Sequence, residues 1–218
     1  MPAEFFRDRT AWVFDLDNTL YPPETRLFDQ IEARMVAYVS AQLKVDAREA
    51  GRLRKLYWAE YGTTLAGLMA LHDLDPEPYL VDVHDIDFSV LSPDPELRAR
   101  ISDLPGRRIV YTNGSAPYAR RVLEARGLSG VFDAVYGVED AGYRPKPEAD
   151  AFARVFARDG LQPDRAAMFE DDPRNLAVPH DLGMRTVLVT PEPLAAQHIH
   201  HHTRDLSGFL AAILPNLS

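Results

Sequence analysis

Short apolar runs recur along the chain and predict the strands of a buried sheet. They lie at residues 11–14, 108–111, 131–136, 166–169 and 185–189. Between the later runs the apolar positions follow a helical period, over residues 118–126, 147–158 and 173–182. Strands that alternate with helices of about 10–12 residues favour a parallel sheet covered on both faces. The pattern therefore predicts an α/β fold.

The first two strands are separated by a long segment without a strand pattern. Helical patterns occur in it at residues 27–39, about 47–61 and 65–71, and a turn-rich piece follows at 73–78. The segment between the predicted strands at 11–14 and 108–111 is too long for a simple connection between strands. We therefore expect a helical subdomain at 22–95, with hinges near 20–23 and 91–95. The core domain would consist of residues 1–21 and 96–218.

Composition narrows the classes of function. The 218 residues are 46% apolar and 26% charged, as in ordinary globular proteins. A net charge of −9 argues against nucleic acid as a partner. The absence of Cys excludes disulfides, Cys-ligated zinc and thiol catalysis. No signal peptide and no membrane-spanning run is recognised, so we expect a cytoplasmic protein without a membrane partner.

Lysine and histidine are unevenly used. Of 24 basic residues only Lys44, Lys55 and Lys146 are lysines, and the first two are interpreted as products of a compositional preference for Arg. Four of the seven histidines lie in His198–His202. We expect that run to be a solvated loop or a helix N-terminus without a catalytic role.

Polar residues follow the predicted strands at their carboxyl ends, where a parallel α/β sheet binds its ligands. These residues are Asp15 and Asp17, then Thr112 and Asn113, then Glu170, Asp171 and Asp172. Lys146 lies in RPKPE, a turn just before a helix. Four or five carboxylates would thus converge on one crevice.

The mutual repulsion of such a cluster of carboxylates must be offset. Two unit charges about 4 Å apart repel by roughly 4 kcal/mol at an effective dielectric constant near 20. The cluster persists if a divalent cation binds in it or if some carboxyls are protonated. Because every ligand would be a hard oxygen, Mg²⁺ is favoured over zinc or copper.

Phosphoryl transfer can account for all of these residues. Asp15 would attack phosphorus and form an aspartyl phosphate. Asp17 would protonate the leaving oxygen and then activate water. Thr112, Asn113 and Lys146 would bind the phosphate oxygens. Asp171 would complete the Mg²⁺ shell, with Asp172 or Glu170 behind it.

The segments FDLDNT, YTNG, RPKP and FEDD resemble, in this order, the four signature motifs of the haloacid dehalogenase-like (HAD) phosphatase superfamily. The resemblance extends over almost the whole chain. It implies a Rossmann-like parallel-sheet core, and it identifies residues 22–95 as a mobile helical cap.

The resemblance also implies roles for single residues. Asp15 would be the nucleophile and Asp17 the general acid/base. The Asp15 side chain, the Asp17 backbone carbonyl and Asp171 would hold Mg²⁺, while Thr112 and Lys146 would hold the phosphoryl group. Dehalogenases lack the second acid, because displaced halide needs no proton, so Asp17 favours a phosphatase.

The cap region resembles the pyrimidine 5′-nucleotidase branch, in DNTLYPPET, YWAEYGTTLAGL and LDPEPYLVDVHDID. UMP or CMP is therefore the expected substrate class. Glu170 departs from that branch's pattern and leaves other sugar-phosphate phosphatases open. We expect Tyr61 and Thr64 to select the leaving group, and Tyr57 and Trp58 to pack in the interior of the cap.

Several alternatives share parts of this pattern. A phosphomutase of the β-phosphoglucomutase type has the same core but returns the phosphoryl group to a sugar. A response-regulator receiver is shorter, has no inserted cap and carries its paired acids first. A decayed site conflicts with the complete residue set. Either a monomer or a homodimer is compatible with the sequence.

Overall fold

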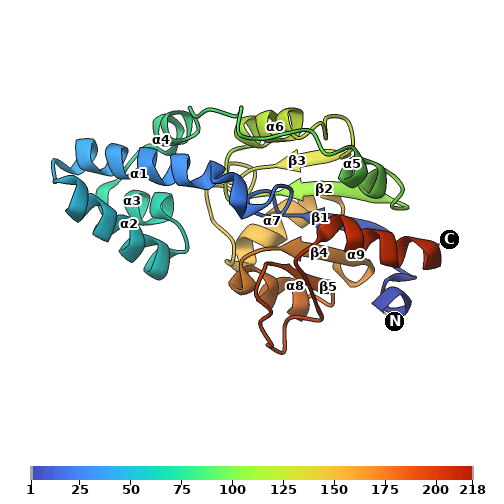
Figure 1. Ribbon diagram of the computed structural model, residues 1–218. Helices are drawn as coiled ribbons and strands as arrows, with labels where there is room; N and C mark the ends of the chain where they lie inside the picture. Colours follow the sequence, from blue (N-terminus) through green and yellow to red (C-terminus); the bar gives the residue numbers. More distant parts are fainter. Residues whose placement is uncertain (1, 218) are drawn as a thin grey trace.

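The computed structural model describes residues 2–217, and its core is a six-stranded parallel sheet (Figure 1). In spatial order the strands are β3 (Ala134–Tyr136), β2 (Arg107–Tyr111), β1 (Ala11–Phe14), β4 (Ala166–Glu170), β5 (Arg185–Val189) and β6 (His201–Thr203). All five neighbouring pairs run parallel, so the carboxyl ends of the strands meet at one edge. The predicted α/β sheet is confirmed, with β1 at its centre.

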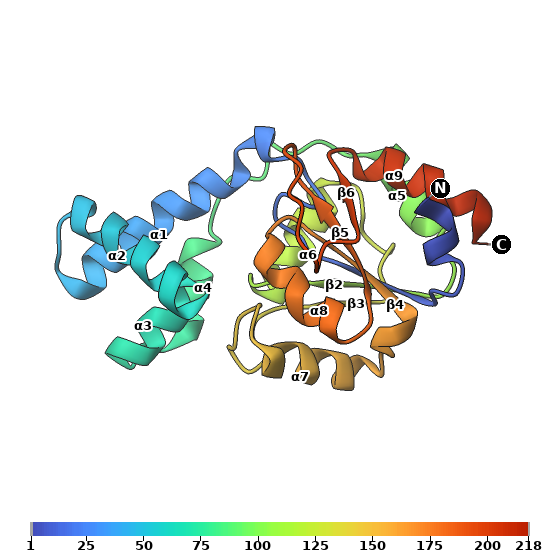
Figure 2. The ribbon, with the colours of Figure 1, turned by 90° about the horizontal axis from the view of Figure 1, so that it is seen from below.

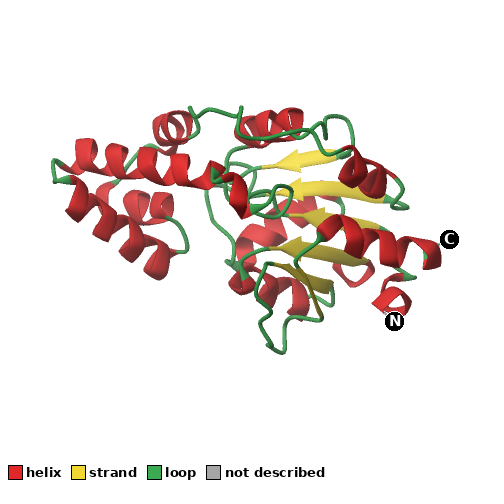
Figure 3. Ribbon diagram, viewed as in Figure 1, coloured by secondary structure: helices red, strands yellow, loops and turns green. Residues whose placement is uncertain are grey.

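Alternate residues of β1 pack on opposite faces of the sheet, as the strand period requires. Trp12 and Phe14 belong to the apolar cluster that also contains residues of α5 (Pro95–Ser102), α6 (Ala116–Ala125) and α9 (Leu206–Ile213). Val13 belongs to a second cluster, shared with α7 (Ala149–Asp159). The α8 helix (Ala177–Asp181) follows a 3₁₀ turn at Pro173–Leu176, where the sequence predicted one continuous helix. Helices therefore cover both faces (Figure 3).

Four helices between β1 and β2 form a separate layer beside the carboxyl end of the sheet (Figures 1 and 2). They are α1 (Leu27–Leu43), α2 (Ala47–Tyr61), α3 (Thr64–His72) and α4 (Pro76–Val83). The α4 helix was not predicted, because the turn residues at 73–78 concealed its start. Asp75 caps that helix by accepting a hydrogen bond from the Glu77 N–H, and Pro76 occupies the first turn.

The two segments that connect this layer to the sheet are held by one arginine. Arg126, at the C-terminal end of α6, is buried. Its Nε donates to the Leu20 carbonyl at 3.1 Å, and its Nη1 donates to the carbonyl of Ser92. Its Nη2 lies 2.7 Å from Asp94 Oδ2. The outgoing and the returning segments therefore meet at the same guanidinium.

The end of the histidine-rich run belongs to the sheet, which corrects our expectation of a solvated loop or helix N-terminus for His201 and His202, while residues 198–200 form a loop before the strand. His201 begins the edge strand β6, and its neighbours use their rings structurally. His200 Nδ1 lies 2.7 Å from Thr186 Oγ1, and His202 Nε2 lies 2.8 Å from the Thr190 carbonyl oxygen. Across residues 2–217, no helix is both long and apolar enough to cross a membrane.

Candidate active site

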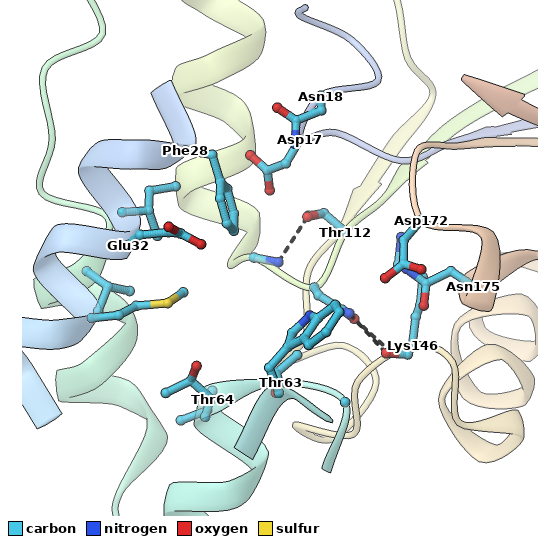
Figure 4. A pocket seen from close by; sticks show the side chains of 18 of the residues that line it. Asp17, Asn18, Phe28, Glu32, Thr63, Thr64, Thr112, Lys146, Asp172 and Asn175 are labelled. Carbon is cyan, nitrogen blue, oxygen red and sulfur yellow. Dashed lines mark hydrogen bonds between the residues drawn. The ribbon is translucent and has the colours of Figure 1, made fainter. Parts of the chain in front are cut away.

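The polar residues that follow β1, β2 and β4 converge with Lys146 on one cavity of about 570 Å³ (Figure 4). The cavity lies between the carboxyl end of the sheet and the α1–α4 layer. Its core side includes Asp15, Asp17, Thr112, Asn113, Lys146, Glu170, Asp171 and Asp172. All eight core residues that the sequence singled out therefore line the same space.

Lys146 is fully buried and joins the first and last of these segments. Its Nζ lies 2.7 Å from Asp15 Oδ1 and 2.6 Å from Glu170 Oε2. It also donates to the Tyr111 carbonyl at 3.0 Å. The two carboxylates keep the amine protonated and raise its pKa, although burial opposes this. A fixed positive charge thus lies beside Asp15.

The β2 end supplies one hydroxyl and one anchoring amide. Thr112 is buried, and its Oγ1 accepts the Gly114 N–H at 2.9 Å, so the hydroxyl hydrogen is free to donate to another group. The Asn113 side chain accepts the Lys146 N–H at 2.7 Å and donates to the Lys146 carbonyl at 3.1 Å. The side chain therefore holds the lysine loop in place, and a contact of Asn113 with phosphate stays a prediction.

Three carboxyl groups form a cluster that fits a divalent cation. Oxygens of Asp15, Glu170 and Asp171 all lie within 4.8 Å of one another. Burial, followed by the charge of Glu170, raises the pKa of Asp15 to about 8, and the same two causes raise the pKa of Asp171. A cation bound among them would remove this repulsion, and three hard oxygens suit Mg²⁺. A bound Mg²⁺ would neutralise charge on the transferring phosphoryl oxygens.

This cluster differs from the predicted ligand set in one member. Glu170, predicted to support the metal from behind, contributes an oxygen directly. The Asp17 side chain lies outside the cluster, which is compatible with a ligand role limited to its backbone carbonyl. Asp172 pairs with Arg174 at 2.6 Å.

The Asp17 carboxyl is held by two phenols. Its Oδ1 accepts hydrogen bonds from the Tyr21 and Tyr118 hydroxyls, each at 2.6 Å. Burial raises the pKa of Asp17, and the two hydrogen bonds oppose that rise. Its neighbour Asn18 donates to Asp171 Oδ2 at 3.2 Å. Neither tyrosine was predicted as a site residue: Tyr21 lies in DNTLYPPET but outside the four signature motifs, and Tyr118 lies in none of the quoted segments.

The opposite wall of the cavity is mainly apolar and comes from α1–α4. Its apolar residues are Phe28, Ile31, Met35, Leu65, Leu80 and Val83. Among them lies an ion pair in which Arg54 Nη1 is 2.9 Å from Glu32 Oε1. Thr64 lines this wall, and its Oγ1 contacts the Arg54 carbonyl at 3.4 Å. Tyr61 instead lines a neighbouring hollow beside Tyr143.

Trp58 lines the cavity and is about half exposed, which corrects the expectation that it packs inside the cap. The Arg174 guanidinium lies 3.7 Å from the centre of its ring. Tyr57 does pack inside. Adjacent residues of a helix point about 100° apart, so Tyr57 and Trp58 face different directions. Trp58 shares its face of α2 with Lys55, and that spacing was the available signal.

The chain is similar to a family of hydrolases and to two proteins named for phosphate metabolism or phosphatase activity. The model of the haloacid dehalogenase-like hydrolase family matches residues 10–183. The phosphate metabolism protein 8 of Saccharomyces cerevisiae is 27% identical over 183 residues, which cover 75% of this chain and 56% of the yeast protein. The glyceraldehyde 3-phosphate phosphatase of Methanopyrus kandleri is 29% identical over 176 residues, covering 74% and 75% of the two chains.

A solved structure shares the fold. The HAD phosphatase from Thermococcus onnurineus superposes with a TM-score of 0.63 at 20% identity, over 94% of this chain and 97% of that one. The resemblance extends through the sheet and the inserted helices. The match spans little more than half the length of the yeast relative.

Proposed function

The chain belongs to the haloacid dehalogenase-like hydrolase family, and we propose that it is a Mg²⁺-dependent phosphomonoesterase that works through an aspartyl phosphate. The observation that carries the proposal is the contact of Lys146 with Asp15 in a cavity that also contains Asp17 and Thr112. A nucleophile, a fixed positive charge, a hydroxyl donor and a second carboxyl are thereby brought together.

The reaction proceeds in two steps on these residues. A carboxylate oxygen of Asp15 bonds to phosphorus while the bond to the leaving oxygen breaks, and Asp17 gives that oxygen its proton. Water then attacks phosphorus and passes a proton to Asp17, so inorganic phosphate and free Asp15 are produced. Lys146 and Thr112 bind the phosphoryl oxygens in both steps.

The helical layer serves this chemistry as a cap domain comprising residues 22–95, inserted into a core of 1–21 and 96–218. The α1–α4 helices pack mainly against one another beside the sheet, and their two connections to the core are adjacent, which supports this division. The cap encloses the leaving group, while the core carries the reacting residues.

We propose pyrimidine nucleoside 5′-monophosphates, such as UMP and CMP, as the substrates. Three features support a planar leaving group with polar edges. The cavity of about 570 Å³ exceeds what a triose phosphate needs, its cap wall is largely apolar, and Trp58 offers an exposed aromatic face. Arg54 and Thr64 supply polar contacts on the same wall.

A small sugar phosphate is the second candidate, because one relative is a glyceraldehyde 3-phosphate phosphatase. A phosphomutase of the β-phosphoglucomutase type is a third. Each predicts a different product or preference, so one panel of substrates separates them.

The test is phosphate release from nucleoside monophosphates and sugar phosphates with Mg²⁺, by the wild type and by Asp15→Asn. We expect UMP and CMP to be preferred and Asp15→Asn to be inactive. Comparable rates across the panel would refute the pyrimidine assignment alone, whereas isomerised sugar phosphate without phosphate release would favour a mutase. Activity that persists in Asp15→Asn would refute the aspartyl phosphate.

Two cap variants test the leaving-group wall. Trp58→Ala is expected to raise KM for UMP by about tenfold, as the loss of one aromatic stacking contact predicts, and to leave KM for glyceraldehyde 3-phosphate within about twofold. Thr64→Ala is expected to change KM for UMP with little loss of kcat for p-nitrophenyl phosphate. Equal losses on all substrates would show that these residues only stabilise the cap.

A further inference from the structure

We propose that Tyr21 and Tyr118 are positioning residues that orient Asp17 so that one defined oxygen, Oδ2, exchanges the proton with the leaving group. The inference rests on the proposed phosphatase function, since it assigns a task within that reaction. It concerns two residues that lie outside all four motifs.

The two hydroxyls reach Asp17 from different parts of the fold. Tyr21 lies in the segment that leads into the cap, and Tyr118 lies on α6 of the core. Both rings are at most 1% exposed, and both hydroxyls are 2.6 Å from the same oxygen, Oδ1. Two short hydrogen bonds from independent directions fix both the position and the rotation of the carboxyl group.

Tyr118 is itself held firmly. Its ring stacks on His84 with the centroids 4.2 Å apart and the planes 7° from parallel. His84 Nδ1 in turn lies 3.2 Å from Oγ of Ser115, the residue that caps α6. The Gly114 backbone also lies close to the ring, because a Cβ on Gly114 would lie 2.9 Å from Tyr118 Cδ1. The phenol therefore cannot follow Asp17 if that side chain rotates.

The hydrogen-bond pattern selects which oxygen carries the proton. With two O–H donors, the in-plane lone pairs of Oδ1 are occupied, so a proton on Asp17 resides on Oδ2. Within residues 2–217, Oδ2 makes no hydrogen bond, and Asp17 lines the cavity (Figure 4). The proton thus moves from Oδ2 to the leaving oxygen as the P–O bond breaks. In the second step the attacking water returns a proton to Oδ2.

A purely structural role makes a different prediction. If the tyrosines only fill the interior, replacement by phenylalanine would affect all substrates alike. A role in orienting the acid matters most when the leaving oxygen is basic and needs the proton, and least for p-nitrophenolate, which departs without one.

The experiment measures kcat/KM of Tyr21→Phe, Tyr118→Phe and the double variant with Mg²⁺, on p-nitrophenyl phosphate and phenyl phosphate. This ratio reports the steps through release of the phenol. We expect a loss of about tenfold or more on phenyl phosphate, a fraction of what a missing general acid costs, and less than about threefold on p-nitrophenyl phosphate. Equal losses on both substrates, or no loss on either, would overturn the inference.

Matched controls keep the outcome interpretable. Tyr136 also donates its hydroxyl to an aspartate, Asp159 Oδ1 at 2.9 Å, on the edge strand β3. Tyr136→Phe should leave kcat/KM unchanged on both p-nitrophenyl phosphate and phenyl phosphate. In an Asp17→Asn background the general acid is already absent. Adding Tyr118→Phe should therefore not change further the ratio of kcat/KM between the two aryl phosphates. Tyr21→Phe provides a second variant if Tyr118→Phe does not fold.

The failure of each proposal has its own signature. If the wild type hydrolyses neither aryl phosphate, the proposed function fails and the inference fails with it. If the wild type is active and Asp15→Asn is not, the proposed function stands. Tyrosine variants that then lose the same factor, or nothing, on both aryl phosphates would overturn only the inference about Tyr21 and Tyr118.

Discussion

Lys146 and Asp15 meet across the end of the sheet, with Nζ of the lysine 2.7 Å from Oδ1 of the aspartate. The same nitrogen lies 2.6 Å from Glu170, so a single buried cation serves two carboxylates. Loss of that cation leaves both acids without their partner.

Lys146→Met is therefore expected to lower kcat for p-nitrophenyl phosphate by at least about a hundredfold, as the loss of a preorganised charge does elsewhere. Removing one member of a buried ion pair also costs about 3–5 kcal/mol of unfolding free energy. Kinetics and urea unfolding measure the two effects. Lys44→Gln, on the exposed end of α1, is the control and should change neither. Full activity of Lys146→Met would contradict the assigned role.

Magnesium is expected to stabilise the protein against heat. A ligand at a hundredfold excess over its Kd adds about 2.7 kcal/mol, and chelation should reverse the rise in Tm. Protons compete for the same carboxyls, and the pKa of Asp15 is raised to about 8, so the gain should increase as the pH rises toward 8. Asp171→Asn should remove most of the gain, while Asp29→Asn on the exposed side of α1 should retain it.

His84 predicts an acid-sensitive contribution to stability. Burial, with a smaller effect of Arg121, lowers its pKa to about 4, whereas an unfolded histidine titrates near 6.5. The folded protein holds the neutral ring, so its contribution is complete above pH 6.5 and is lost as the pH falls toward 4. Urea unfolding of the wild type and His84→Gln should show their difference shrinking by about 1–3 kcal/mol over that window. Parallel curves would contradict this.

Arg126→Met is expected to loosen the cap connections. It leaves the Leu20 and Ser92 carbonyls without their donor and Asp94 without its partner. Since Asp94 is about one-third exposed, the expected loss is about 2–4 kcal/mol of unfolding free energy. Amide hydrogen exchange should accelerate at the non-proline residues of these connections, which are Leu20, Tyr21, Leu91, Ser92 and Asp94. Arg120→Met, exposed on the same helix, should leave both measurements unchanged.

The parts of the fold with a strong local pattern could be predicted from the sequence. The predicted strands at 11–14 and 185–189 have the bounds of β1 and β5. The strand predicted at 131–136 is shorter, because pairing in register begins only after Asp133, whose carboxylate accepts the Arg108 N–H. The β6 strand was missed, since HIHHH lacks the apolar residues that mark a strand, and its histidines gain partners only in the folded chain.

The site also contains residues that a local sequence pattern indicates and residues that no such pattern indicates. The residues that react follow strands directly, so a parallel sheet brings Asp15, Thr112 and Asp171 together by its topology. Tyr118 lies 101 positions from Asp17, and no local pattern relates them. The sequence did not show that a Glu170 oxygen lies in one cluster with Asp15 and Asp171, because its place at the end of β4 brings its carboxyl beside both Lys146 and Asp171. Contacts of this kind depend on packing, which the sequence does not display.

The two ends of the cap meet at Arg126, and this has a consequence for protein engineering. Since the chain leaves and re-enters the core at one point, we expect the sheet to tolerate a different number of residues between Leu20 and Ser92. We therefore expect that a cap of another size would fit between these two carbonyls, with the Arg126 guanidinium closing the junction. If the proposed division into core and cap holds, the reacting residues stay with the core, and exchange of the cap should change the substrate preference.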